Sequence, residues 1–187
     1  MSNSISPNYT FDDFPEQLSL QDKIKIFNDR INGWQIDIAQ QCITNIAHSG
    51  FAVLNIISSY FEMIAKFKDG YTKEGNSGLF FKRAFKEFLS VLHHYEEAEA
   101  KIVADKAWKG IRCSLDHTGI TRGAYLSSEF NVSIRYSEKD NILYLNPHLL
   151  VPELKEYFGL YIEELNKPEN EELQRKFILR YDAQYEK

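Results

Sequence analysis

A short polar segment, residues 111–123, contains the side chains of this chain that are best suited to phosphate chemistry. It holds Arg112, His117 and Arg122 within eleven positions, with Asp116 directly before the histidine. An imidazole gains and loses a proton near neutral pH, so it can act as a general base and then as a general acid. A guanidinium stays charged and stabilises phosphoryl oxygens with two parallel hydrogen bonds. We therefore interpret Arg112 and His117 as a candidate catalytic pair for phosphodiester chemistry.

The spacing of this pair resembles the signature of the HEPN superfamily. The segment reads Arg112-Cys-Ser-Leu-Asp-His117, and the family motif is an arginine, four to six residues, and a histidine near the end of a bundle helix. The resemblance covers residues 18–119. It departs at Cys113, where the family commonly has asparagine or aspartate.

The resemblance implies an all-helical domain that forms a homodimer. It implies a metal-independent endoribonuclease or an RNA-binding protein of the toxin or defence type. The expected partners are RNA, a second copy of the chain, and a protein partner such as an antitoxin. Cleavage of RNA through its 2'-hydroxyl needs a base and an acid, which would be His117, and a group that stabilises the phosphate, which would be Arg112.

The geometry of a regular helix raises a difficulty for this pair. Five residues rotate by about 500°, which leaves Arg112 and His117 roughly 140° apart. Either the helix loosens before His117, or the long arginine side chain curls round it. The resemblance also implies that the second subunit contributes its own copy of the motif.

Three further residues are candidates for substrate binding or for positioning the pair. Asp116 and Arg122 flank the motif, although ordinary surface ion pairs are an alternative. Glu62 lies on the polar stripe of another predicted helix. It could face Arg112, or it could pair with Lys66 one turn further on.

Structural roles remain open for the motif itself. The arginine could pair with a carboxylate on another helix, and the histidine could be an exposed residue at a helix end. His93 and His94 are adjacent, so one helix face cannot present both to a metal ion. We expect neither a metal site nor a cofactor.

The elements that must position these residues are mostly helices. Apolar residues recur at steps of three and four, which predicts helices over residues 18–46, 53–67, 79–92 and 100–117. The first contains Gly33, a weak point, and its predicted core face includes Trp34 and Ile38. The fourth has a core face of Ala104, Trp108, Ile111 and Leu115. Gly119 is its predicted stop signal.

The pattern changes after the fourth helix. Strict alternation over residues 130–136, a turn, and an apolar run over 141–145 predict a β-hairpin, with a third short strand at 124–126. Two helices follow, over 150–165 and 173–181. The predicted fold is mainly α: a bundle of about four core helices with an inserted β-hairpin and two C-terminal helices. In domain terms, an irregular arm (1–17) precedes one helical domain (18–187), made of the HEPN-like bundle (18–119), the hairpin (124–146) and the C-terminal helices (148–185).

Composition limits the function classes. The chain has 187 residues, 43% of them hydrophobic, which suits one domain with a real core. Its net charge of -5 excludes a global basic surface for nucleic acid, so RNA would need a local patch. The two cysteines favour a reducing compartment. No secretion signal is visible and polar residues interrupt the apolar stretch 51–67, so we expect a cytoplasmic protein that does not enter the membrane.

Two other functions fit the same pattern. The chain could be a non-catalytic dimeric interaction module, in which Arg112 and His117 are structural. Less in keeping with the polar motif, the aromatic-rich bundle could enclose a small apolar ligand.

Overall fold

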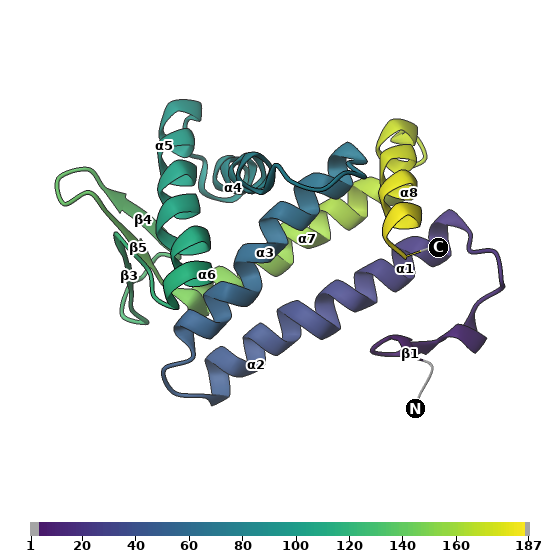
Figure 1. Ribbon diagram of the computed structural model, residues 1–187, viewed down its shortest axis with the longest axis horizontal. Helices are drawn as coiled ribbons and strands as arrows, with labels where there is room; N and C mark the ends of the chain where they lie inside the picture. Colours follow the sequence, from purple (N-terminus) through teal and green to yellow (C-terminus); the bar gives the residue numbers. More distant parts are fainter. Residues whose placement is uncertain (1–3, 186–187) are drawn as a thin grey trace.

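The computed structural model describes residues 4–185, except for the side chain of Asp116, and it is mainly α-helical as predicted (Figure 1). The helices are α1 (Leu20–Ile31), α2 (Asp37–Asn45), α3 (Gly50–Asp69), α4 (Ser77–His93), α5 (Glu97–Ala107), α6 (Ser114–Thr118), α7 (Pro147–Asn166) and α8 (Glu171–Tyr185). The strands are β1 (Ser4–Ser6), β2 (Tyr9–Thr10), β3 (Ala124–Leu126), β4 (Ile134–Ser137) and β5 (Ile142–Leu145).

Helix α3 forms the centre of the bundle and packs against α2, α4, α7 and α8. Its apolar residues at steps of three and four are buried, which confirms the predicted periodicity: Val53, Leu54, Ile57, Tyr60, Phe61, Ile64 and Phe67. Phe61 lies at the middle of an aromatic cluster, with ring centroids 4.8–5.6 Å from those of Phe81, Phe85 and Phe88 on α4. None of the described helices combines the length and the apolar character needed to cross a membrane.

The first long helix is continuous but contains a π-helical turn, Asn32–Ile36, at the weak point that Gly33 marks. A π turn accommodates an extra residue, so the face that follows it is rotated relative to a regular α-helix. The prediction that Trp34 and Ile38 belong to the core is therefore wrong: their exposed fractions are 51% and 42%. The buried apolar positions are Ile36 at the end of the turn and Ala39 and Ile43 beyond it.

The N-terminal segment is more ordered than the predicted irregular arm. Strands β1 and β2 pair in an antiparallel arrangement. The carboxylate of Asp29 on α1 accepts hydrogen bonds from the Ser6 hydroxyl at 2.6 Å and from the Asn8 backbone N–H at 2.9 Å. These bonds attach the segment to α1.

The predicted hairpin is confirmed as β4 and β5, and the short third strand is also present. The sheet order is β3-β5-β4, in which β3 is parallel to β5 and β4 is antiparallel to it. The first hairpin strand begins at Ile134 rather than at residue 130. The buried Asn146 side chain donates to the carbonyls of Ser128 and Phe130, so it fixes the irregular segment that replaces the start of the predicted strand.

Candidate functional site

The helix that carries the motif contains a widened turn that ends at Cys113, four residues before His117. Helices α5 and α6 are joined by a π-helical turn, Trp108–Cys113, and the Ser114 hydroxyl donates to the Lys109 carbonyl at 2.8 Å across it. A π turn contains more residues than an α turn, so each residue contributes a smaller rotation about the helix axis. The end of this turn lies between Arg112 and His117, so their angular separation is smaller than it would be on a regular helix. Only Arg112 and Cys113 of the turn belong to this interval, and Ser114–Thr118 is α-helical, so most of the predicted separation between the two side chains remains.

The chain then folds back onto the same helix. Gly119 has a positive φ and ends α6 in the left-handed conformation that glycine favours, which confirms the predicted stop. Three residues later, the backbone N–H of Arg122 donates to the carbonyl of Gly110 at 3.0 Å. A Cβ atom on Gly110 would lie 2.4 Å from the Arg122 carbonyl oxygen. Gly110 and Arg112 are two positions apart, about 200° of rotation on a regular helix, so the Arg122 backbone contacts the side of the helix roughly opposite Arg112.

Glu62 of α3 lies near Arg112. Its carboxylate accepts hydrogen bonds from the Lys66 ammonium at 2.6 Å and from the Ser77 hydroxyl at 2.8 Å. Burial raises the pKa of Glu62, but these two hydrogen bonds and the charges of Lys66 and Arg112 together lower it below its usual value. The side chains of Glu62 and Lys66 are only 15% and 12% exposed. Glu62 thus bonds to Lys66 and Ser77, and it also interacts with the charge of Arg112.

The remaining motif residues differ in their surroundings. Arg112 is half-buried at the junction of the motif helix with α3, whereas His117 and Arg122 are exposed to solvent. Asp116 belongs to α6, but its side chain lies outside the described part of the structure. The structure therefore brings Glu62 to Arg112 and the Arg122 backbone to Gly110, and it leaves the imidazole of His117 exposed to solvent.

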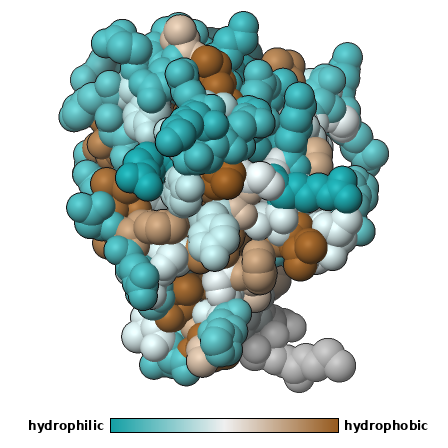
Figure 2. Space-filling view, turned by 90° about the vertical axis from the view of Figure 1, so that its left-hand side faces the viewer, coloured by the Kyte–Doolittle hydropathy of each residue, from teal (hydrophilic) through white to brown (hydrophobic). Residues whose placement is uncertain are grey.

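Apolar side chains are exposed on the face that carries the sheet and the α2–α3 connection. Ile46, Phe51, Ile120 and Tyr125 are exposed by 58%, 41%, 57% and 62%. Figure 2 shows this side of the molecule, where hydrophobic and hydrophilic side chains are interleaved. The motif helix ends on this face, because Ile120 follows the α6 stop signal directly.

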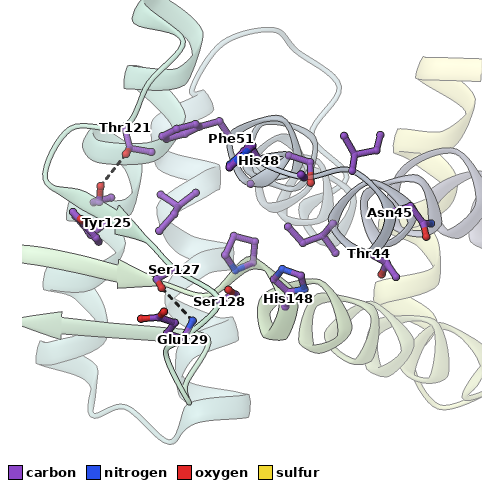
Figure 3. A pocket seen from close by; sticks show the side chains of 18 residues that line it. Thr44, Asn45, His48, Phe51, Thr121, Tyr125, Ser127, Ser128, Glu129 and His148 are labelled. Carbon is purple, nitrogen blue, oxygen red and sulfur yellow. Dashed lines mark hydrogen bonds between the residues drawn. The ribbon is translucent and has the colours of Figure 1, made fainter.

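A pocket of about 840 Å³ opens beside these residues (Figure 3). Three segments that are distant in sequence line it: the α2–α3 connection, strand β3 with the loop that follows it, and the start of α7. It contains two histidines, His48 and His148, and two aromatic rings, Phe51 and Tyr125. Thr121 also lines it, so the pocket borders the loop that carries Arg122.

Sequence patterns did not indicate this pocket. His148 is exposed at the start of α7, and nothing in the sequence connects it with His48, a hundred residues earlier. The available signals were weak: a break at 48–50 and a turn-rich segment at 127–129. Only the tertiary arrangement brings these segments together.

Metal binding has no visible basis in residues 4–185: with the Asp116 side chain excluded, no three histidine, cysteine, aspartate or glutamate side chains group as ligands. Comparisons with protein-family models, with curated proteins and with solved structures gave no match to this chain.

Proposed function

We propose that this chain is a HEPN-like, metal-independent endoribonuclease that acts through Arg112 and His117. One observation carries the proposal: the hydrogen bond from the Arg122 N–H to the Gly110 carbonyl, which folds the loop back onto the widened helix. It holds the Arg122 backbone beside the helix whose end carries Arg112 and the exposed His117, and we infer that these three side chains act together. In this proposal they form the local cationic patch that an acidic chain needs for RNA.

The reaction follows from the chemistry of these side chains. His117 removes the proton from a 2'-hydroxyl, and the 2'-oxygen attacks the adjacent phosphorus. The 5'-oxygen leaves with a proton from an imidazole, so the products carry a 2',3'-cyclic phosphate and a 5'-hydroxyl. Arg112 stabilises the charge on the non-bridging oxygens.

Glu62 is a positioning residue in this scheme. Its lowered pKa keeps it ionised at neutral pH, so it holds the Arg112 guanidinium by charge. The group formed by Glu62, Lys66 and Arg112 still carries one net positive charge, because two cations face one carboxylate. In the proposed homodimer, the motif ends of the two subunits meet, and the second His117 supplies the acid.

The experiment is cleavage of a fluorescent RNA in EDTA. Arg112→Ala and His117→Ala should each lower the rate at least about 100-fold, as loss of an acid–base or charge-stabilising group does. His94→Asn, at an exposed histidine elsewhere, is the control and should cleave normally. The 3' ends should carry cyclic phosphate. Cleavage that EDTA abolishes, or that survives in His117→Ala, would refute the proposal.

A second candidate function, a dimeric interaction module, is favoured by the exposed apolar residues of the same face. Ile120 and Tyr125 are each more than half exposed, which is typical of residues at protein–protein contacts. In this case Ile120→Ser and Tyr125→Ser would shift the sedimentation coefficient from dimer to monomer, and the wild type would show no cleavage. A homodimer or a bound antitoxin-like protein would both cover this face. Wild-type sedimentation as a monomer would exclude the homodimeric form.

A further inference from the structure

We propose that the pocket between the α2–α3 connection, β3 and the start of α7 binds a nucleoside monophosphate. A free nucleotide and the 5' end of an RNA would both present the groups that we expect the pocket to bind: a phosphate monoester and a planar ring. The inference does not depend on RNA cleavage, because none of Arg112, His117 and Glu62 lines the pocket.

The size and composition of the pocket fit a small ligand. Its volume of about 840 Å³ falls in the range of roughly 300–1,000 Å³ that small-molecule sites occupy. Its wall combines apolar side chains such as Ile43 and Leu126 with hydroxyls such as Thr44 and Ser127. A mixed wall with a few convergent polar groups is typical of a site that orients its ligand.

Two imidazoles approach the pocket from different elements. His48 lies in the α2–α3 connection and has a positive φ. This left-handed backbone conformation sets the direction of its Cα–Cβ bond. The backbone N–H of His148 donates to the Asn146 side chain at 3.0 Å, which fixes that residue at the start of α7. Both side chains are exposed and line the pocket, so both can donate an N–H to a phosphate oxygen. Backbone amides in the first turn of α3, which also borders the pocket, add donors.

Aromatic rings at the same pocket suit the planar part of the ligand. Phe51 and Tyr125 line it and remain 41% and 62% exposed. In Figure 3 Phe51 lies beside His48, and Tyr125 lies on the sheet side. Any nucleobase can stack on such rings, because every base has an aromatic face.

The charge distribution decides where the phosphate lies. Of the described residues that line the pocket, Glu129 alone is acidic. It lies beyond the end of β3, where its backbone N–H donates to the Ser127 hydroxyl at 3.1 Å. In Figure 3 it is on the opposite side of the pocket from His48 and Phe51. The phosphate therefore belongs at the His48 end, next to the first turn of α3.

The test is a calorimetric titration with AMP, compared with adenosine and with inorganic phosphate. AMP should bind with a dissociation constant of about 1 mM or lower, and adenosine and phosphate should each bind at least about tenfold more weakly. A 5'-phosphorylated trinucleotide distinguishes the source of the ligand: equal or tighter binding would indicate an RNA end, and weaker binding a free nucleotide.

The matched variants are His48→Asn and His94→Asn. Both histidines are exposed and have a positive φ, so asparagine, which tolerates the left-handed conformation, suits both positions. Only His48 lines the pocket. His48→Asn and His148→Gln should each weaken AMP binding about tenfold, the usual cost of a lost hydrogen bond to a charged group, and His94→Asn should not change it.

The outcomes separate this inference from the proposed function. Adenosine that binds as tightly as AMP, or AMP binding unchanged in both His48→Asn and His148→Gln, would overturn the phosphate site. If these two variants cleave RNA at the wild-type rate, the nucleotide pocket is separate from the proposed nuclease site. Absence of AMP binding to the wild-type protein would overturn the inference alone.

Discussion

Substitution of Gly110 by alanine tests the contact that holds the Arg122 loop against the motif helix. In an ordinary helix, this change stabilises a protein by up to about 1 kcal/mol. At Gly110, however, the new Cβ would lie 2.4 Å from the Arg122 carbonyl oxygen, closer than van der Waals contact allows. The loop must move, which breaks the 3.0 Å hydrogen bond between these residues. A lost hydrogen bond costs about 1 kcal/mol and overpacking about 1–3 kcal/mol, so the net loss of unfolding free energy should be about 2 kcal/mol.

Gly159 provides the matched control. It lies inside α7, and a Cβ atom there meets none of the described atoms within 4 Å. Gly159→Ala should therefore raise the free energy of unfolding by about 1 kcal/mol. The measurement is urea unfolding followed by circular dichroism, with RNA cleavage assayed on the same samples. Gly110→Ala should also lose cleavage, because Arg122 moves from the motif helix. If both substitutions stabilise the protein equally, the folded-back loop is not a rigid part of the structure.

Three further predictions concern stability. Glu62→Ala leaves Lys66 and Arg112 without their carboxylate and should cost about 3 kcal/mol, whereas Arg112→Ala leaves the Lys66 and Ser77 bonds intact and should cost about 1 kcal/mol. Equal losses in urea unfolding would make Arg112 the main partner of Glu62. Since the folded pKa of Glu62 lies below its ordinary value of 4.5, its contribution is present above that pH and is lost as the pH falls through the folded pKa. Glu62→Gln should therefore flatten the acid limb of a plot of unfolding free energy against pH, and an unchanged limb would contradict the shift. Ser19→Ala removes the side chain that caps α1 and should cost about 1 kcal/mol, measured as a lower Tm; an unchanged Tm would show that the cap contributes little.

The helices were predictable because each buries one apolar stripe. On α3 and α4 the residues at three- and four-residue steps are the buried ones, including Phe61, Phe81 and Phe85. Periodicity reports burial directly as long as the helix has a constant twist. The strands were predictable for the same reason, although β4 is shorter than the alternating pattern.

Prediction failed where the twist changes. A stripe drawn at regular spacing through Gly33 assigns Trp34 and Ile38 to the core, but the π turn shifts burial to Ile36 and Ala39. A π turn depends on a balance of local packing that periodicity does not encode. Here the tertiary partner is visible: a Cβ on Gly33 would lie 2.5 Å from the Pro7 side chain, so the N-terminal segment packs against this turn.

The candidate site was predictable only in part, for a related reason. The spacing of Arg112 and His117 is local and can be read from the sequence, whereas the pocket is assembled from three separate segments. The interaction of Glu62 with Arg112 was one of two alternatives, and the structure shows that the two alternatives are compatible. Glu62 bonds to Lys66 and also acts on Arg112.

This shared carboxylate bears on whether Arg112 can serve a substrate. Suppose that a guanidinium were the only cation beside a buried carboxylate. Turning it towards a phosphate would then leave the carboxylate buried without a cation, at a large cost in free energy. Glu62 already accepts from Lys66 and Ser77, so it keeps two donors when Arg112 turns towards a phosphate. In the proposed reaction, the bonds from Lys66 and Ser77 thereby lower the free-energy cost of turning Arg112 towards a phosphate. Lys66→Met should consequently reduce RNA cleavage while Arg112 is intact, with a larger effect on KM than on kcat, because Glu62 would then compete with the phosphate for the guanidinium. Equal cleavage parameters for Lys66→Met and wild type would show that Glu62 does not restrain Arg112.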